Sequence, residues 1–240
     1  MIKIIPAMDI IGGKCVRLTQ GDFSRATVYS DDPLETAKQF AAAGLTRLHV
    51  VDLDGARLGA PANLHVLKRV ASGTSLTIDY GGGVKSDDDV AAVFDAGAAI
   101  INVGSIAVRQ RETFLGWLGK FGSEKFLLGG DSNRGKIAID GWQTKTEFDT
   151  VGFLAGMFAH GVSRAFVTDI GSDGTMAGPS LSLYQKIRTA LPDLKLIASG
   201  GVRSIEDIDE LERIGCSGVI VGRALYEEKI ILEDLTKYVG

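Results

Sequence analysis

The chain has 240 residues, 45% hydrophobic and 23% charged, and is long enough to bury the core of one large or two small domains. Its 26 basic and 30 acidic residues give a net charge of −4, which excludes a uniformly basic chain that binds nucleic acid non-specifically. Glycine is the unusual component, with 31 residues, about 13% of the chain against an average of roughly 7%. The positions of these glycines therefore need an explanation.

Short apolar runs rich in β-branched residues alternate with amphipathic segments from one end of the chain to the other. We predict strands at 2–8, 46–52, 75–80, 99–103, 125–130, 163–169, 194–199 and 217–221. Helices are predicted at 33–43, 61–72, 86–96, 109–119, 147–160, 181–190, 204–214 and 231–238. Eight such units predict an α/β protein with one (β/α)8 TIM barrel domain over 1–240. The alternative, an open doubly wound sheet, would need a GxGxxG turn after the first strand, where residues 9–14 read DIIGGK.

Local signals mark the ends of several helices. N-terminal caps are predicted at Asp32-Pro33, at Ser86 with Asp89, and at Ser204 with Asp207. One set of glycines lies between a helix and the next strand, where a left-handed C-cap is expected: Gly44, Gly73, Gly97, Gly161 and Gly215.

A second set of glycines follows the strand ends, where barrel enzymes place their chemistry. This set includes two Gly-Gly-Val motifs, in which Gly83 and Gly201 are 118 positions apart. Gly104 and Gly222, after the next strand of each half, have the same separation. The chain therefore reads as two similar half-barrels, about 1–122 and 123–240, which indicates a duplication.

Glycine lets backbone N–H groups approach an anion, and the helix that starts next presents its positive end, so each repeat suits a phosphate. The predicted phosphate-binding residues are Gly82, Gly83, Gly104 and Ser105 in the first half and Gly200, Gly201, Gly222 and Arg223 in the second. In an eight-stranded barrel these two sites oppose each other, and Asp9 and Asp131 flank the space between them. The predicted ligand is elongated, carries a phosphate at each end and reacts at its centre.

The remaining signals concern compartment and cofactors. The first residues show no secretory leader, and no apolar stretch is long enough to span a bilayer, so we expect a cytoplasmic protein without a membrane partner. Cys15 and Cys216 have no partners at metal-ligand or disulfide spacing, so no metal is expected. His49, His65 and His160 lie inside predicted strands and helices and are interpreted as structural.

Over nearly its whole length the sequence resembles the HisA family, the phosphoribosylformimino-imidazole-carboxamide ribotide isomerases of histidine biosynthesis. The resemblance is carried by 5–9, 13–22, 51–56, 81–84, Asp131, Gly141-Trp142, 168–175, 199–203 and 221–225. It implies a bis-phosphorylated aminoaldose substrate and an Amadori rearrangement to the aminoketose, with no cofactor. The stretch Gly129-Gly130-Asp131 departs from the Gly-Leu-Asp usual in the family.

By the same resemblance, Asp9 is the general base and Asp131 the general acid. Asp173 is a rival acid, and Thr168 could position the substrate. Trp142, with Arg134, would close over the aminoimidazole by stacking, and a first loop with Arg17, Gln20, Gly21 and Asp22 would act as a lid. Gly178 is also expected to bind phosphate. We read Asp52 and Asp169 first as polar or structural groups at the strand ends. The expected enzyme is a monomer that binds this small molecule and no nucleic acid.

Other functions stay open at this point. The cyclase subunit of imidazole glycerol phosphate synthase shares the barrel, both phosphate sites and two aspartates, although 51–56 and 20–22 look like the isomerase. A bifunctional isomerase would also accept phosphoribosyl anthranilate. A flavin-binding barrel would leave the first phosphate site unexplained, and a non-catalytic phosphosugar-binding module would have no use for opposed carboxylates.

Overall fold

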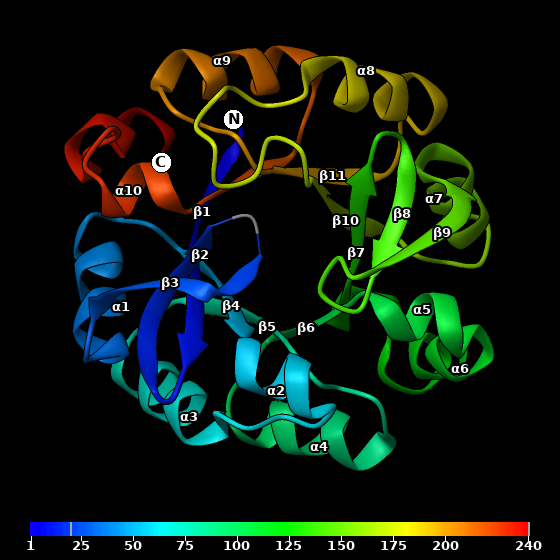
Figure 1. The fold of residues 1–240 in the computed structure, drawn as a ribbon, viewed down its shortest axis with the longest axis horizontal. Helices are drawn as coiled ribbons and strands as arrows, with labels where there is room; N and C mark the ends of the chain where they lie inside the picture. Colours follow the sequence, from blue (N-terminus) through cyan, green and yellow to red (C-terminus); the bar gives the residue numbers. More distant parts are fainter. Residues whose placement is uncertain (20, 240) are drawn as a thin grey trace.

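The structure, a computed structural model, describes residues 1–19 and 21–239. Eight parallel strands form a closed barrel inside a ring of helices (Figure 1). In barrel order the strands are β1 (Lys3–Ile11), β4 (Arg47–Asp52), β5 (Thr77–Gly81), β6 (Ile100–Val103), β7 (Phe126–Asn133), β10 (Arg164–Asp169), β11 (Lys195–Ser199) and β12 (Gly218–Val221). The barrel closes where β12 pairs with β1, from Lys3 opposite Gly218 to Pro6 opposite Val221. The predicted (β/α)8 fold is confirmed.

Seven α-helices cover the barrel close to their predicted positions: α1 (Pro33–Ala42), α3 (Leu64–Gly73), α4 (Asp87–Asp95), α6 (Arg111–Phe121), α7 (Thr150–Phe158), α8 (Leu181–Ala190) and α9 (Ile205–Ile214). The α-helix predicted at 231–238 is wrong in type, because Leu232–Tyr238 forms a 3-10 helix, η2. Four short helices were not predicted: α2 (Leu53–Leu58), α5 (Ser105–Arg109), α10 (Arg223–Tyr226) and the 3-10 helix η1 (Ser123–Lys125). Segments of three to six residues are too short for a helical period to be recognised.

Two antiparallel ribbons extend from the strand ends, where the sequence suggested loops. The first is β2 (Lys14–Thr19) with β3 (Asp22–Ser30), and the second is β8 (Lys136–Ile139) with β9 (Thr144–Asp149). The prediction of a helix over 147–160 was therefore wrong at its start. Residues 147–149 belong to β9, and α7 begins only after Asp149, whose carboxylate accepts a hydrogen bond from the Gly152 N–H at 2.8 Å.

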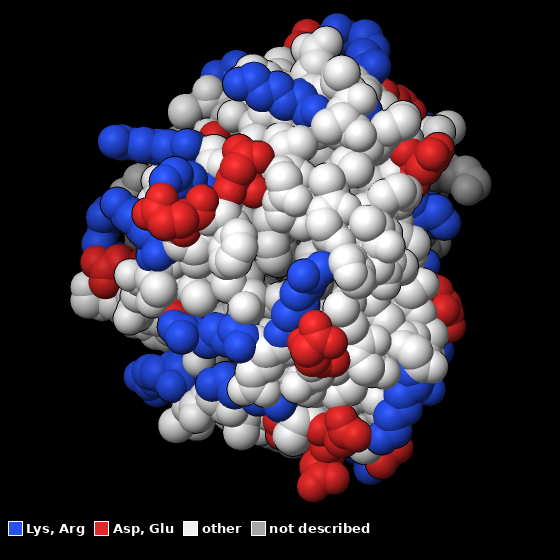
Figure 2. Space-filling view, turned by 90° about the vertical axis from the view of Figure 1, so that its right-hand side faces the viewer, with Lys and Arg blue, Asp and Glu red and all other residues white. Residues whose placement is uncertain are grey.

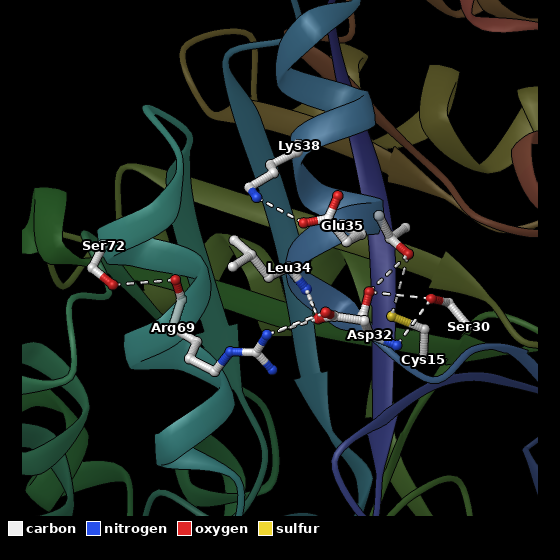
Figure 3. Close-up of polar contacts among 9 residues, drawn as sticks. Cys15, Ser30, Asp32, Leu34, Glu35, Lys38, Arg69 and Ser72 are labelled. Carbon is white, nitrogen blue, oxygen red and sulfur yellow. Dashed lines mark hydrogen bonds and ion pairs between the residues drawn. The ribbon is translucent and has the colours of Figure 1, made fainter.

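The first ribbon is anchored to the helices around the barrel where β3 passes into α1 (Figure 3). Asp32 caps α1 by accepting the N–H of Leu34 at 3.1 Å, and its carboxylate also pairs with Arg69 of α3. The Asp32-Pro33 cap is thus confirmed, as is the capping box of Ser86 and Asp89.

Two of the predicted caps are wrong. Ser204 makes no side-chain cap, although Asp207 accepts the N–H of Arg203 at 3.0 Å. Gly73 is still helical and has no positive φ, whereas Gly44, Gly97, Gly161 and Gly215 all have one.

The inside of the barrel combines an apolar cluster with one polar network. The apolar side chains are Ile5, Ala7, Ile100, Leu127, Ile197 and Ile220. Beside them Asp79 of β5, fully buried, contacts Arg47 Nη2 at 2.9 Å and His49 Nδ1 at 2.5 Å and accepts a hydrogen bond from Asn102 Nδ2 at 2.8 Å. These three partners come from β4 and β6, so the network ties neighbouring strands together.

Two observations concern the surface. On the face in Figure 2, charged residues of both signs are interspersed around a broad uncharged area, and no extended basic surface is present there. No helix among residues 1–19 and 21–239 is long and apolar enough to cross a membrane.

Candidate active site

Asp9 lies near the carboxyl end of β1 and is held by the first ribbon. Because Asp9 is opposite Val16 in the β1–β2 pairing, the neighbouring Arg17 can fold back over it. Arg17 Nη1 lies 3.0 Å from Asp9 Oδ2, and both side chains are largely buried. Burial raises the pKa of Asp9, and the Arg17 guanidinium opposes that rise. The carboxylate is therefore a stronger base than a solvated aspartate while its partner keeps it charged.

Asp131 occupies the corresponding place near the end of β7. It is directly opposite Thr168 of β10, so the side chains of both residues lie on the same face of the sheet. Burial raises the pKa of Asp131 to about 6, although hydrogen bonding with Thr168 and Trp142 lowers it and Asp173 raises it. A carboxyl group with this pKa can carry a proton near neutrality, as a general acid must.

Asp173 belongs to the long turn that follows β10. Its N–H donates to the carbonyl of Asp169 at 3.0 Å, which fixes the start of the turn. Burial raises the pKa of Asp173; the nearby Arg17 lowers it and Asp9 raises it. Arg17 therefore stabilises the charge of two carboxylates at once. The structure brings Asp9, Asp131, Asp173 and Thr168 to one end of the barrel.

The second-half glycines line a hollow at the ends of β11 and β12. Its walls include Arg17, Asp173, Gly200, Gly201, Gly222 and Arg223. Gly178 closes one side, since its N–H donates to the carbonyl of Gly201 at 3.0 Å. Arg223 is held in place, with Nη1 donating to the Gly174 carbonyl at 2.6 Å and Nε paired to Glu227 at 2.5 Å. The hollow adjoins Asp173 and so opens toward the carboxylates.

The first-half glycines lie four strands away, after β5 and β6, on the opposite side of the barrel. Asp52 shapes this turn. It is fully buried and accepts hydrogen bonds from the N–H groups of Gly55 and Asn63 and from the Tyr80 hydroxyl. Gly82 packs on Asp52 so tightly that an added Cβ would lie 2.1 Å from the Asp52 carbonyl oxygen. Asp52 is therefore structural, as its position at the strand end suggested.

The two ribbons meet above the carboxylates. An added Cβ on Gly21, in the β2–β3 turn, would lie 2.7 Å from Cε3 of Trp142, in the β8–β9 turn. Of the other residues expected in these segments, Gln20 lies outside the described residues, while Asp22 begins β3 and Arg134 is exposed with φ 52°. The lid expected as a loop is thus largely a two-stranded ribbon, because β2 pairs with β3 from Cys15 opposite Ser30 to Thr19 opposite Asp22.

His49 is a polar residue near this site that the sequence reading assigned only to structure. Its ring is buried, and its proximity lowers the pKa of both Asp9 and Asp131. The available signal was the two-residue period of β4, which turns the side chains of Arg47, His49 and Val51 to one face. Nothing in the sequence indicated that this face is the inside of the barrel below the carboxylates.

Substitution of two glycines separates packing from ligand contact. Gly201→Ala should destabilise the fold by roughly 2 kcal/mol or more, because φ is +80° and the new Cβ would lie 2.3 Å from the Gly178 carbonyl oxygen. Gly104→Ala should change stability by only about 0.5 kcal/mol, because nothing lies within 4 Å of its added Cβ. Urea unfolding checks both values. A rise in KM for the stable Gly104 variant would place the phosphate there, and an unchanged KM would remove Gly104 from the site.

Comparison with known proteins agrees with this geometry. Residues 3–231 match the family described as histidine biosynthesis protein. A 1-(5-phosphoribosyl)-5-((5-phosphoribosylamino)methylideneamino)imidazole-4-carboxamide isomerase of Parabacteroides distasonis is 52% identical over 238 residues, 99% of this chain and 100% of that protein. Proteins of the same name from Bacteroides thetaiotaomicron and Flavobacterium psychrophilum are 48% and 44% identical, each covering at least 98% of both chains. The chain belongs to the histidine biosynthesis protein family.

Proposed function

We propose that this protein is an isomerase that converts the bis-phosphorylated aminoaldose named in its relatives to the corresponding aminoketose by an Amadori rearrangement. The observation that carries the proposal is the pair of glycine-lined turns on opposite sides of one barrel mouth, with buried and partly buried carboxylates between them. A substrate with a phosphate at each end would span the mouth and hold its central sugar near these carboxylates. Relatives covering the full chain carry the name of this activity.

The reaction requires an acid and then a base. Protonation of the ribose ring oxygen opens the sugar to a Schiff base, and removal of the C2′ proton gives an enolamine that rearranges to the ketose. We assign the base to Asp9, because Arg17 keeps it ionised and burial makes it more basic than a solvated aspartate. Thr168, opposite Asp131 in the sheet, is assigned to orient the reacting groups.

The acid is assigned to Asp131, with Asp173 as the rival. Asp131 is favoured because burial raises its pKa to about 6, although Thr168 and Trp142 act to lower it. Asp173 also has a raised pKa but shares the field of Arg17, which favours its charged form. A proton donor close to neutral pKa transfers its proton more readily than one held ionised by a cation.

The direct test supplies the purified protein with the aminoaldose alone. Conversion to the aminoketose without ammonia, metal or flavin is the expected result, and chromatographic separation of the two isomers, which have the same mass, measures it. Failure to convert would contradict the proposal. Phosphoribosyl anthranilate in a second assay shows whether the same site accepts another phosphoribosyl amine.

The pH profile distinguishes the two candidate acids. If Asp131 donates the proton, kcat/KM falls as the pH rises through about 6, because the carboxyl group must be protonated to act. Asp131→Asn should then remove this alkaline limb and lower the rate about 100-fold or more. A limb that persists unchanged in Asp131→Asn, and disappears in Asp173→Asn, would transfer the role to Asp173.

We further propose that one chain suffices for catalysis and that the reaction uses no cofactor. Both phosphate-binding turns and all three carboxylates come from a single chain, which supports a monomer. The free thiols of Cys15 and Cys216 are buried, and burial raises the pKa of these thiols to about 11 and about 12, so neither is activated for chemistry. Unpaired cysteines suit the reducing cytoplasm.

A further inference from the structure

The turn that carries Trp142 has an unusual backbone. Asp140, Gly141 and Trp142 have φ values of 57°, 61° and 72°, so three consecutive residues occupy the left-handed region. Glycine adopts this region freely and aspartate tolerates it, but a tryptophan is strained there. Such a conformation persists only when the surroundings hold it.

The surroundings that hold it belong to one short helix. Arg109, the last residue of α5, contacts the carboxylate of Asp140 with two nitrogens, Nη2 at 2.5 Å from Oδ2 and Nε at 3.3 Å from Oδ1. Ser105, the first residue of α5, accepts the N–H of Asp140 on its hydroxyl oxygen at 2.9 Å. Figure 1 shows α5 beside the β8–β9 ribbon. Both ends of α5 thus fix a single residue, two positions before the tryptophan.

Trp142 in turn completes the surroundings of Asp131. Its side chain lies close enough to Asp131 to lower the pKa of that carboxyl group, and its ring lies against Gly21 of the opposite ribbon. A displaced Trp142 would therefore lose contact with a carboxyl group proposed to be catalytic and would open the mouth to water. A two-point Arg–carboxylate contact fixes orientation as well as distance, which a single lysine contact does not.

We propose that Ser105, Arg109 and Asp140 form a latch whose function is to position Trp142 over Asp131. The latch residues are positioning residues, because none of them contacts the reacting carboxylates. The expected loss of kcat/KM rests on the proposed isomerase function, whereas the expected change in the accessibility of Trp142 does not. Ser105, which the sequence predicts to bind phosphate, also takes part in this latch. Its hydroxyl oxygen accepts the N–H of Asp140, so its hydroxyl proton stays free to donate to a ligand.

The chain offers a direct optical test, because it contains two tryptophans and the other is inaccessible. Trp117 is 2% exposed and donates its indole N–H to Asp87 at 2.6 Å, so acrylamide quenching of fluorescence reports chiefly on Trp142. Trp142→Phe gives the contribution of Trp117. We expect Arg109→Ala to raise the quenching constant of Trp142 about twofold and to lower kcat/KM about tenfold, since displacement of a positioned group by 1 Å can cost up to about 100-fold.

Three variants make the test specific. Asp140→Asn keeps a residue that tolerates the left-handed region but removes the charge, and should act like Arg109→Ala. Arg109→Lys keeps the charge with one contact and should give intermediate quenching. Arg213→Ala, which removes an exposed arginine paired with Glu210 on α9, should change neither readout.

The outcomes separate the latch from the proposed function. Unchanged quenching in Arg109→Ala and Asp140→Asn overturns the latch, as does a fall in kcat/KM without a change in quenching, because the effect would then not pass through Trp142. Quenching that rises in both variants while the unmodified protein fails to isomerise the aminoaldose supports the latch and refutes the isomerase proposal alone.

Discussion

Asp9→Asn should abolish turnover while leaving the substrate bound. The substitution keeps the shape of the side chain but removes the base that takes the C2′ proton, and general base catalysis contributes about 100- to 10,000-fold to such reactions. We expect kcat to fall about 1,000-fold or more and the dissociation constant for the substrate to change by less than about tenfold, because phosphate binding takes place at the two distant glycine turns.

The effect of Asp9→Asn on Arg17, the ion-pair partner of Asp9, requires a separate control. Arg17 loses its ion pair in Asp9→Asn but still lies near Asp173, so its charge is not left without a partner. Equilibrium binding of the product and single-turnover kinetics separate affinity from chemistry. Asp95→Asn, an exposed aspartate at the end of α4, provides a matched substitution far from the mouth. Near-normal kcat in Asp9→Asn would remove Asp9 from the role of base.

Asp79→Ala should cause the largest loss of stability among the substitutions considered. Removal of this buried carboxylate leaves the Arg47 guanidinium, His49 Nδ1 and the Asn102 amide without their shared acceptor inside the barrel. Breaking a buried ion pair from one side costs about 3 to 5 kcal/mol. For a chain of this size that corresponds to a fall in Tm of roughly 10 °C. Denaturant unfolding followed by circular dichroism measures the change.

The charge of Asp79 also predicts a pH dependence. Although burial opposes it, His49 and Arg47 lower the pKa of Asp79 below its ordinary value. Its contribution to stability is therefore complete above about pH 4, the ordinary range for an unfolded aspartate, and is lost as the pH falls through the lower folded pKa. Asp79→Asn, which preserves the shape, should lose less stability than alanine and should flatten this acid limb. Equal unfolding free energies for Asp79→Ala and the unmodified protein would show that the network stabilises nothing.

The network lies on β4, β5 and β6, between the strands that carry Asp9 and Asp131, which explains why a stability residue can influence chemistry. His49 pairs with Asp79 and also lowers the pKa of Asp9 and Asp131. The barrel is close-packed, so a shift of His49 would be transmitted to the carboxylates directly above it. Asp79 variants should therefore be compared by their pH profiles as well as by their unfolding free energies.

Much of this protein could be predicted from the sequence because the signals are local. Alternation of apolar runs and amphipathic segments predicts the eight strands, and paired glycines 118 positions apart predict two equivalent turns. Once the barrel is assumed, strand order alone puts these turns on opposite sides, and β5–β6 and β11–β12 do oppose each other. Asp32 and Ser86 cap their helices as expected because a cap depends on residues within one turn.

The tertiary structure decided what depends on residues distant in the chain. The ribbon at 136–149 is not evident locally, since the acidic residues Glu147 and Asp149 suit the first turn of a helix as well as the end of an exposed strand. The partners of Asp79 and the contact of Arg109 with Asp140 join residues about 20 to 30 positions apart, at separations that no helical or strand period specifies. The sequence by itself determined the barrel and the repeated turns, through periodicity and short-range glycine geometry. Only the folded chain decided which carboxylates are desolvated, which arginine accompanies them and how Trp142 is held, because burial and charge proximity arise from packing across the barrel.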